Sequence, residues 1–320
     1  MSLTLCLSTP EGIVLAADSR QSYRNSVGVS RVGSDSATKI FPVNKQVGIT
    51  VAGPAFLVDP KEKIPNLKGI GSYVQDFLNQ LTKEETVKTI AEKLQKHLEM
   101  LYKPENQLKD LELLAEKQIV QSGGKIIKKE TTPFKEATII NFTDKEGKPQ
   151  QAVAQIMPIS IIVSGYDFLK IRNPELNAYM FNVPGRPMEH IRKHGDQNQY
   201  GANWTGQTDV ITRIILGFDP RIENVAFVQA AKQNIGDVKI LEALRSLEYN
   251  INWGGMTLSD AIAFAKLMIE TTSAVQKFSD GIKMMPGEMP GVGGPIDVAV
   301  ILPYEGFRWH QRKELHLENL

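Results

Sequence analysis

The chain has few of the side chains on which metal or thiol chemistry depends. His190 and His194 stand four residues apart, a spacing that could bring two ligands to one face of a helix. No acidic residue stands between them and no third ligand is evident, so we expect a solvated basic helix and no metal site. Cys6 is the single cysteine and lies within an apolar segment, which favours core packing over a nucleophilic role. The residue types therefore indicate no metal and no cofactor.

Composition limits the class of protein. Of the 320 residues, 42% are hydrophobic and 23% charged, ordinary values for a globular chain. The 37 basic and 36 acidic residues give a net charge of +1, which predicts neither nucleic acid nor an anionic membrane as a partner. No apolar run is long enough to cross a bilayer, and the first twelve residues lack the pattern of a secretory signal. With one cysteine, no disulfide within the chain is possible, so we expect a cytoplasmic protein.

Hydrophobic periodicity and turn signals predict groups of strands that alternate with groups of helices. Strands are expected over residues 2–8, 13–17, 39–43, 46–52, 136–142, 151–156, 160–165, 176–182, 296–302 and 306–310. Helices are expected over 72–102 with a break near 82–85, over 108–120, 206–217 and 257–278, and twice within 221–249. Segments 21–37 and 121–135 are predicted to be loops. Locally grouped strands and helices favour an α+β fold over a parallel βαβ fold.

Three segments near the N-terminus resemble the proteasome β-type family of N-terminal nucleophile hydrolases. They read Gly-Ile-Val-Leu-Ala-Ala-Asp-Ser-Arg at 12–20, Thr-Lys-Ile-Phe at 38–41 and Thr-Val-Ala-Gly at 50–53, in the order that the family shows. Segments 160–217 and 257–310 look like the second sheet and the last helix and strands of that family. The resemblance implies a single domain over 1–320 with a four-layer αββα sandwich, carrying insertions at 100–157 and 221–250.

The resemblance also implies that Ser2 is the nucleophile, because the family's spacing counted back from Asp18 ends there. The small side chain of Ser2 permits removal of Met1, which would leave a hydroxyl and a free α-amine on one residue. Such an amine has a pKa of about 7.7–8.0 and can serve as the base, so no histidine is needed. Lys39 would lie beside Ser2 and favour the reactive protonation states, with Asp18 orienting Lys39. Taken alone, Asp18 and Lys39 would be interpreted as a surface ion pair.

Three further residues complete the implied site. Arg20 would brace the network around Asp18. The backbone N–H of Gly53 would donate to the oxyanion of the transition state, a contribution of about 3 kcal/mol, although a plain turn glycine is the simpler interpretation. Thr205, in the segment Ala-Asn-Trp-Thr-Gly-Gln, matches a Ser-Gly or Thr-Gly of the family and is the candidate supporting hydroxyl. The same threonine could also cap the helix expected over 206–217.

One segment departs from the family pattern. The family carries Asp-x-x-Ser-Gly-Gly before its last strand pair, whereas residues 289–294 read Met-Pro-Gly-Val-Gly-Gly. Val292 therefore replaces the serine, and Met289 stands where the aspartate would be. Asp280 and Glu288 are the nearby carboxylates that could substitute for it.

The sequence favours a hydrolase that cleaves peptide or amide bonds through an acyl intermediate on Ser2. The resemblance implies a homo-oligomer, as a ring or an open spiral, that acts on peptides or unfolded proteins; the need for an unfoldase partner is left open. Two alternatives remain. One is a catalytically silent scaffold with the same fold, which the departure at 289–294 favours. The other is an amidase that acts on small molecules.

Overall fold

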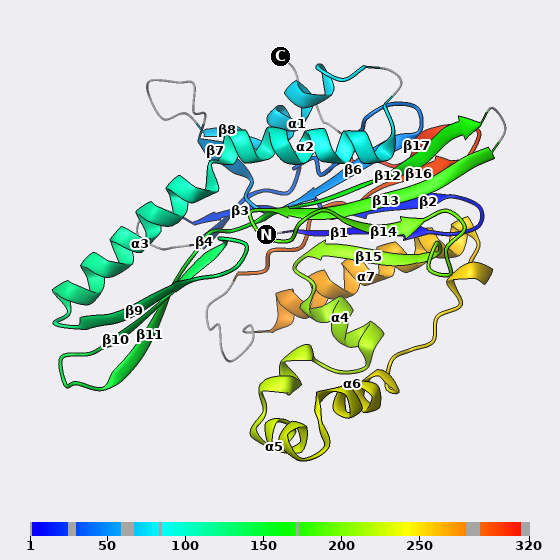
Figure 1. Ribbon diagram of the computed structural model, residues 1–320. Helices are drawn as coiled ribbons and strands as arrows, with labels where there is room; N and C mark the ends of the chain where they lie inside the picture. Colours follow the sequence, from blue (N-terminus) through cyan, green and yellow to red (C-terminus); the bar gives the residue numbers. More distant parts are fainter. Residues whose placement is uncertain are drawn as a thin grey trace. The chain divides into compact units, whose positions relative to one another are not determined.

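The computed structural model describes residues 2–24, 30–58, 67–82, 85–170, 173–279 and 289–314 (Figure 1). The chain divides into two compact units. Unit 1 comprises residues 1–37, 200–300 and 309–320, and unit 2 comprises residues 38–199 and 301–308. Each unit contains an antiparallel sheet that packs against helices, so the predicted α+β class is confirmed. The four-layer αββα arrangement and the single-domain organisation stay predictions.

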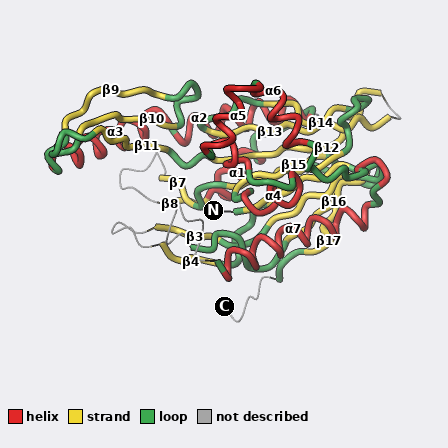
Figure 2. Tube along the Cα trace, turned by 90° about the horizontal axis from the view of Figure 1, so that it is seen from below, coloured by secondary structure: helices red, strands yellow, loops and turns green. Residues whose placement is uncertain are grey.

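Unit 1 is built on a five-stranded sheet in the order β15-β1-β2-β16-β17. These strands are β1 (Leu3–Ser8), β2 (Ile13–Ala17), β15 (Gly201–Gly206), β16 (Asp297–Leu302) and β17 (Gly306–Gln311). The helices of the unit are α4 (Asp209–Leu216), α5 (Ala226–Ile235), α6 (Asp237–Arg245) and α7 (Leu258–Phe278), with short 3-10 turns η1 (Pro220–Asn224) and η2 (Trp253–Gly255). Helix α7 runs across this sheet and packs on β1 and β2 (Figure 2).

Strand β1 is buried on both faces. Leu3, Leu5 and Leu7 alternate toward the apolar cluster that α4 and α7 share with the sheet. Thr4 and Cys6 point to the opposite face and are also buried. The start of α7 follows the sequence prediction, because Thr257 and Asp260 form a capping box that satisfies backbone donors of its first turn.

Unit 1 also contains a hairpin that the sequence did not predict. Strands β3 (Gln21–Arg24) and β4 (Ser30–Ser34) pair within the segment that was expected to be a loop over 21–37. Polar Ser, Gln and Arg residues dominate this segment, so it shows no alternation of apolar and polar positions. The described strands of the hairpin pair through their backbones, which a search for hydrophobic periodicity does not detect.

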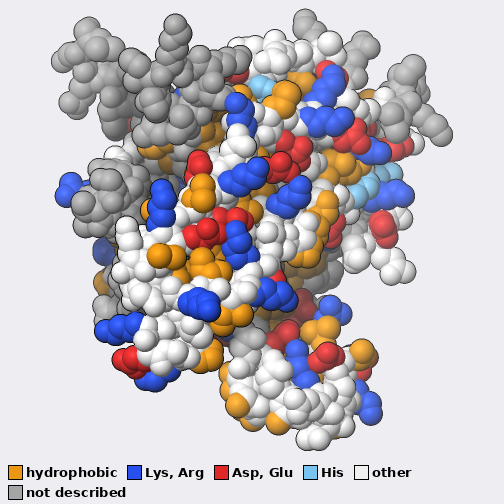
Figure 3. Space-filling view, turned by 60° about the vertical axis from the view of Figure 1, so that its left-hand side comes forward, with side chains coloured by type: hydrophobic (Ala, Val, Ile, Leu, Met, Phe, Trp, Pro, Cys, Tyr) orange, Lys and Arg blue, Asp and Glu red, His pale blue; other side chains and the backbone are white. Residues whose placement is uncertain are grey.

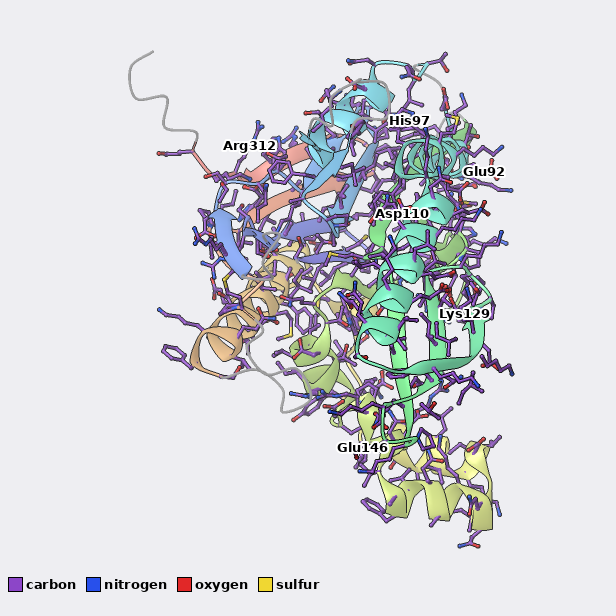
Figure 4. The ribbon with its side chains drawn as sticks, turned by 90° about the vertical axis from the view of Figure 1, so that its left-hand side faces the viewer. Glu92, His97, Asp110, Lys129, Glu146 and Arg312 are labelled. Atoms are coloured by element: carbon purple, nitrogen blue, oxygen red, sulfur yellow. The ribbon has the colours of Figure 1, made fainter. Side chains whose placement is uncertain are left out.

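Unit 2 contains a second five-stranded sheet, in the order β14-β13-β12-β6-β5. Its strands are β5 (Ile40–Pro42), β6 (Val47–Ala52), β12 (Ile159–Lys170), β13 (Asn173–Val183) and β14 (Glu189–Lys193). Helix α2 (Val87–Tyr102) packs on β12 and β13, and α1 (Ile70–Leu78) contacts α2. His97 of α2 lies against Phe77 of α1, with ring centroids 5.5 Å apart (Figure 4). A short pair, β7 (Phe56–Val58) and β8 (Leu67–Gly69), leads into α1.

The segment that follows α2 forms a helix packed on three strands. Helix α3 (Pro104–Gln121) contacts the sheet formed by β9 (Lys125–Thr131), β10 (Ala137–Thr143) and β11 (Pro149–Gln155). The Nζ atom of Lys129, on β9, forms an ion pair with Oε1 of Glu116, on α3, at 2.6 Å (Lys129 is labelled in Figure 4). The predicted loop over 121–135 is therefore wrong over residues 125–131, which form β9. Strand β9 is almost wholly exposed and pairs with β10, so its lysines give it no strand signature in the sequence.

A basic helix over 190–194 is likewise wrong, because residues 189–193 form β14. The ring of His190 stacks on Tyr179 of β13, with centroids 4.3 Å apart. Its Nε2 atom lies 2.9 Å from the amide oxygen of Asn177. His194 lies beyond the strand, so the two histidines do not share a helix face. Pairing with β13 decides the conformation of this segment.

On the face shown in Figure 3, basic and acidic side chains are interspersed, in keeping with the net charge of +1. Among the described residues, every helix is too short or too polar to span a lipid bilayer. The described residues also contain no group of three histidine, cysteine, aspartate or glutamate side chains arranged to hold a metal ion.

Candidate functional site

The peptide that joins Ser2 to Leu3 is fixed on both sides. The carbonyl of Ser2 accepts a hydrogen bond from the backbone N–H of Gln207 at 2.6 Å. On the other side, the N–H of Leu3 donates to Oδ1 of Asp18 at 2.9 Å. Ser2 is 5% exposed. These contacts hold the peptide plane that follows Ser2 and so fix the position of its Cα atom, which carries the amine and the Cβ–Oγ side chain.

Asp18 connects three segments of unit 1 through its fully buried carboxylate. Besides the N–H of Leu3, it accepts the N–H of Arg20 and the N–H of Gly293, each at 3.0 Å on Oδ2. The N–H of Asp18 itself donates back to the carbonyl of Leu3 at 3.3 Å. Three backbone donors compensate the burial of this charge. The start of β1, the end of β2 and the loop before β16 are thereby joined at one side chain.

Arg20 packs against the loop before β16, the same loop whose Gly293 is bonded to Asp18. Its guanidinium donates to both carboxylate oxygens of Asp35, at 2.8 and 3.1 Å. The hydrogen bond to Asp35 raises the pKa of Arg20, which keeps the guanidinium charged. Gly293 packs so closely on this group that a Cβ atom there would lie 2.6 Å from Cζ of Arg20. Gly294 has φ +73° and would place a Cβ 2.9 Å from Asp35, including its backbone oxygen, so any other residue there would be strained.

The segment 289–294, which departs from the family pattern, is held by the burial of Val292 and by hydrogen bonds to Gln276. Val292 is fully buried in the apolar cluster of unit 1. Oε1 of Gln276, on α7, accepts the N–H groups of Gly291 and Val292 at 3.1 and 3.0 Å. Nε2 of Gln276 lies 3.0 Å from Oε1 of Gln207, the residue that holds Ser2. A glutamine on a helix thus positions a loop for which the family pattern carries a serine. Asp280 and Glu288 lie outside the described residues.

Thr205 does not cap a helix. It lies within β15 opposite Thr4, and the two hydroxyl oxygens are 2.9 Å apart. Helix α4 begins later, at Asp209, and its N-cap residue Thr208 makes no side-chain bond to the helix. The capping role predicted for Thr205 is therefore wrong, because β15 extends to Gly206 and keeps the threonine in the sheet.

Lys39 and Gly53 belong to unit 2, and their part in the site stays a prediction. Lys39 is buried, and its carbonyl accepts the N–H of Val51 at 2.9 Å. Gly53 has φ +135°, and a Cβ there would lie 2.5 Å from the carbonyl oxygen of Pro158. The close approach to Pro158 accounts for the glycine at this turn in structural terms. Within unit 1 the structure brings together Ser2, Asp18 and Arg20.

Sequence reasoning missed Asp35, Gln207 and Gln276. Asp35 lies within the segment 21–37 that was expected to be a loop, and no local pattern marks it as the partner of Arg20. Gln276 lies inside a strongly amphipathic helix, where a polar residue is expected to be solvated. Among the residues around Asp18 that were not predicted, only Gly293 could have been found from the sequence, because the family pattern also contains this glycine pair.

Comparisons with known proteins find no matching family model and no matching curated protein. Among solved structures, a similar chain is an Anbu (Gly-1) mutant from Hyphomicrobium sp. strain MC1, at 12% identity and a TM-score of 0.43. The match covers 100% of this chain and 89% of that one. A likeness at this level supports neither family membership nor function. The assignment to the proteasome β-type family, made on three short segments, is therefore corrected: the chain has a distant structural neighbour and no demonstrated family.

Proposed function

We propose that this protein hydrolyses amide bonds with Ser2 as an N-terminal nucleophile. The observation that carries the proposal is the Ser2–Leu3 peptide held by Gln207 on one side and by the buried carboxylate of Asp18 on the other. The carboxylate of Asp18 accepts three backbone N–H groups and so fixes the start of β1. Such preorganisation is needed where a nucleophile must meet a substrate carbonyl in a defined direction.

The proposed chemistry needs a hydroxyl and a free amine on the same residue. After removal of Met1, the α-amine of Ser2 takes the hydroxyl proton as Oγ attacks the substrate carbonyl carbon. The amine then gives that proton to the departing nitrogen, and the C–N bond breaks to leave an ester on Ser2. Water attacks the ester carbonyl carbon and gives a proton to the same amine. The amine passes this proton to Oγ as the C–Oγ bond breaks, which releases the acid product and restores Ser2.

The remaining roles are part of the proposal. Lys39 supplies the positive charge that favours the deprotonated hydroxyl and the neutral amine. The N–H of Gly53 donates to the oxyanion. Asp18 accepts backbone N–H groups, one of them at the start of β1, and orients Lys39. Arg20, paired with Asp35, braces the network around Asp18. Thr205 supports the start of β1 through the hydroxyl of Thr4.

Neighbouring groups in β1 are poor candidates for the nucleophile. The hydroxyl of Thr4 lies in a hydrogen bond with Thr205, and Thr4 is fully buried. The thiol of Cys6 is 1% exposed, and Cys6 pairs in mid-strand with Leu15 and Asn203. Neither residue can acquire a free α-amine without loss of the strand that positions it.

A silent scaffold is the second candidate, favoured by the apolar side chains of Val292 and Met289. Where the family pattern provides a hydroxyl and a carboxylate, this chain provides one core residue and one methionine. The two candidates differ in one measurable property, which is the reactivity of Ser2.

The experiment combines intact mass, labelling and hydrolysis. We expect the purified protein to lack Met1, to cleave members of a peptide library, and to be labelled at Ser2 by a peptide epoxyketone, which bridges hydroxyl and amine. Ser2→Ala should lose labelling and hydrolysis. Ser8→Ala is the matched control, because it removes a buried, unpartnered hydroxyl at the other end of β1 and should leave activity unchanged. Retention of Met1, labelling at Thr4 or Cys6, or full activity of Ser2→Ala would contradict the proposal.

A further inference from the structure

A cavity of about 500 Å³ in unit 1 lies beside the residue that holds Ser2. Gln207 lines the cavity, and its backbone N–H is the donor to the carbonyl of Ser2. Gln276 lines it as well and is hydrogen-bonded to Gln207. The cavity is therefore separated from the proposed nucleophile by a single residue.

The charged wall of this cavity is a pair of arginines that share one carboxylate. Arg213 of α4 donates through Nε to Oδ2 of Asp219 at 2.7 Å. Arg221 of η1 donates to Oδ1 of the same carboxylate through Nε and through its backbone N–H, both at 2.9 Å. The bonds from Arg221 and Arg213 lower the pKa of Asp219, so this carboxylate is ionised throughout the physiological range. The shared acceptor lets two guanidinium groups lie together without uncompensated repulsion.

The hydrogen bonds to Asp219 use only part of the donor capacity of the two arginines. A guanidinium has five N–H donors, and Asp219 receives the Nε and Nη2 groups of both arginines. The described contacts leave Nη1 of each arginine uncommitted. Asp219, in contrast, has its acceptor positions occupied. Asp209 also lines the cavity, so its two arginines and two aspartates have a net charge of zero. An anion would therefore be held by directed hydrogen bonds and not by net charge.

We propose that this cavity binds the leaving-group side of the substrate and selects a carboxylate there. The inference rests on the proposed function, because only a nucleophile at Ser2 makes the neighbouring cavity part of a substrate site. Planar guanidinium groups match a carboxylate in geometry, and the pair is preorganised by Asp219. The carboxylate could be the C-terminus of a short peptide or an acidic side chain, since both present the same group.

Binding to the Ser2→Ala protein tests the cavity without turnover. Three ligands are compared by calorimetry: trialanine, trialanine amide, and Ala-Ala-Glu amide. We expect the carboxylate ligands to bind about tenfold more tightly than trialanine amide, as for one charge-assisted hydrogen bond. Preference for trialanine over Ala-Ala-Glu amide identifies the chain end as the recognised group, and the reverse identifies the side chain.

Arginine variants connect the preference to the cavity. Arg213→Gln should reduce the affinity for the carboxylate ligands to that for the amide, while Asp219 keeps Arg221 as a partner and the fold is maintained. Arg245→Gln is the matched control, since Arg245 is an exposed residue at the end of α6 and is not part of the cavity wall. Thermal unfolding of both variants verifies that they are folded. Equal binding of the three ligands, no binding of any, or an unchanged preference in Arg213→Gln overturns the inference.

The failure of this inference differs from a failure of the proposed function. Hydrolysis that depends on Ser2 but shows no carboxylate preference overturns the cavity assignment alone. A carboxylate preference that depends on Arg213, in a protein whose Ser2 is never labelled, overturns the nucleophile and with it the leaving-group role of the cavity.

Discussion

The contact between Gly293 and Arg20 yields a quantitative test of how the N-terminus is held. In Gly293→Ala, the added Cβ would lie 2.6 Å from Cζ and 2.9 Å from Nε and Nη1 of Arg20. The guanidinium cannot move away at low cost, because it donates to both oxygens of Asp35. Either this pair breaks or the loop shifts and weakens the Gly293 bond to Asp18. Overpacking of this kind costs about 1–3 kcal/mol.

Denaturant unfolding of five proteins measures the effect: wild type, Gly293→Ala, Arg20→Ala, the double variant and a control. Gly293→Ala should lose about 1–3 kcal/mol of unfolding free energy relative to wild type. The same change in an Arg20→Ala background should cost at least about 1 kcal/mol less, because the atom that clashes is absent. Gly254→Ala is the control in unit 1, where a Cβ meets only ordinary contacts at 3.7 and 3.8 Å.

Two outcomes would refute this reasoning. One is a Gly293→Ala protein as stable as wild type. The other is an equal cost of the substitution with and without Arg20, which would locate the strain elsewhere. If Ser2 is the nucleophile, Gly293→Ala should also lower the turnover number while the Gly254→Ala control does not.

Three further predictions concern charge, pH and assembly. Lys39→Met keeps the apolar stem and removes the charge, so turnover should fall at least about a hundredfold while the melting curve is retained; unchanged turnover excludes Lys39 from the site. Burial lowers the pKa of the His190 imidazole below 6.5 in the folded chain. The unfolded chain therefore binds a proton at His190 more tightly, and the unfolding free energy should rise as the pH increases up to about 6.5. His190→Gln should remove this rise, measured as unfolding free energy at several pH values. Helices α5 and α6 leave Phe227 and Val238 about two-thirds exposed, and we expect light scattering to show particles larger than 35.6 kDa that become smaller when both residues are changed to serine.

Elements with a strong local pattern could be predicted from the sequence. The hairpin of β1 and β2 is marked by two apolar runs around a Pro-Glu-Gly turn, and α7 by its capping box and long amphipathic repeat. Strands β3, β9 and β14 could not be predicted, because each is polar and is stabilised by pairing with a neighbour. Strand β14 pairs with β13, and the ring of His190 stacks on Tyr179 of that strand; no local pattern contains either contact.

The candidate site shows the same division between local and distant information. Asp18 and Arg20 stand two residues apart at a strand end, so one motif contains both. Asp35 lies 15 residues from its partner Arg20, and Gly293 lies 275 residues from Asp18. Only the folded chain brings these groups together. The contacts of Gly293 with Arg20 and of Gly294 with Asp35 explain the two glycines, and these contacts exist only in the folded chain.

The bond between Gly293 and Asp18 also orders events during synthesis. The first strand emerges from the ribosome early, yet one of the three donors that hold Asp18 is translated 275 residues later. The hydrogen bond from Gly293 to Asp18 can therefore form only after nearly the whole chain has been synthesised. Once the fold closes, Ser2 is 5% exposed. If Ser2 is the nucleophile, we therefore expect Met1 to be removed before this loop closes on Asp18.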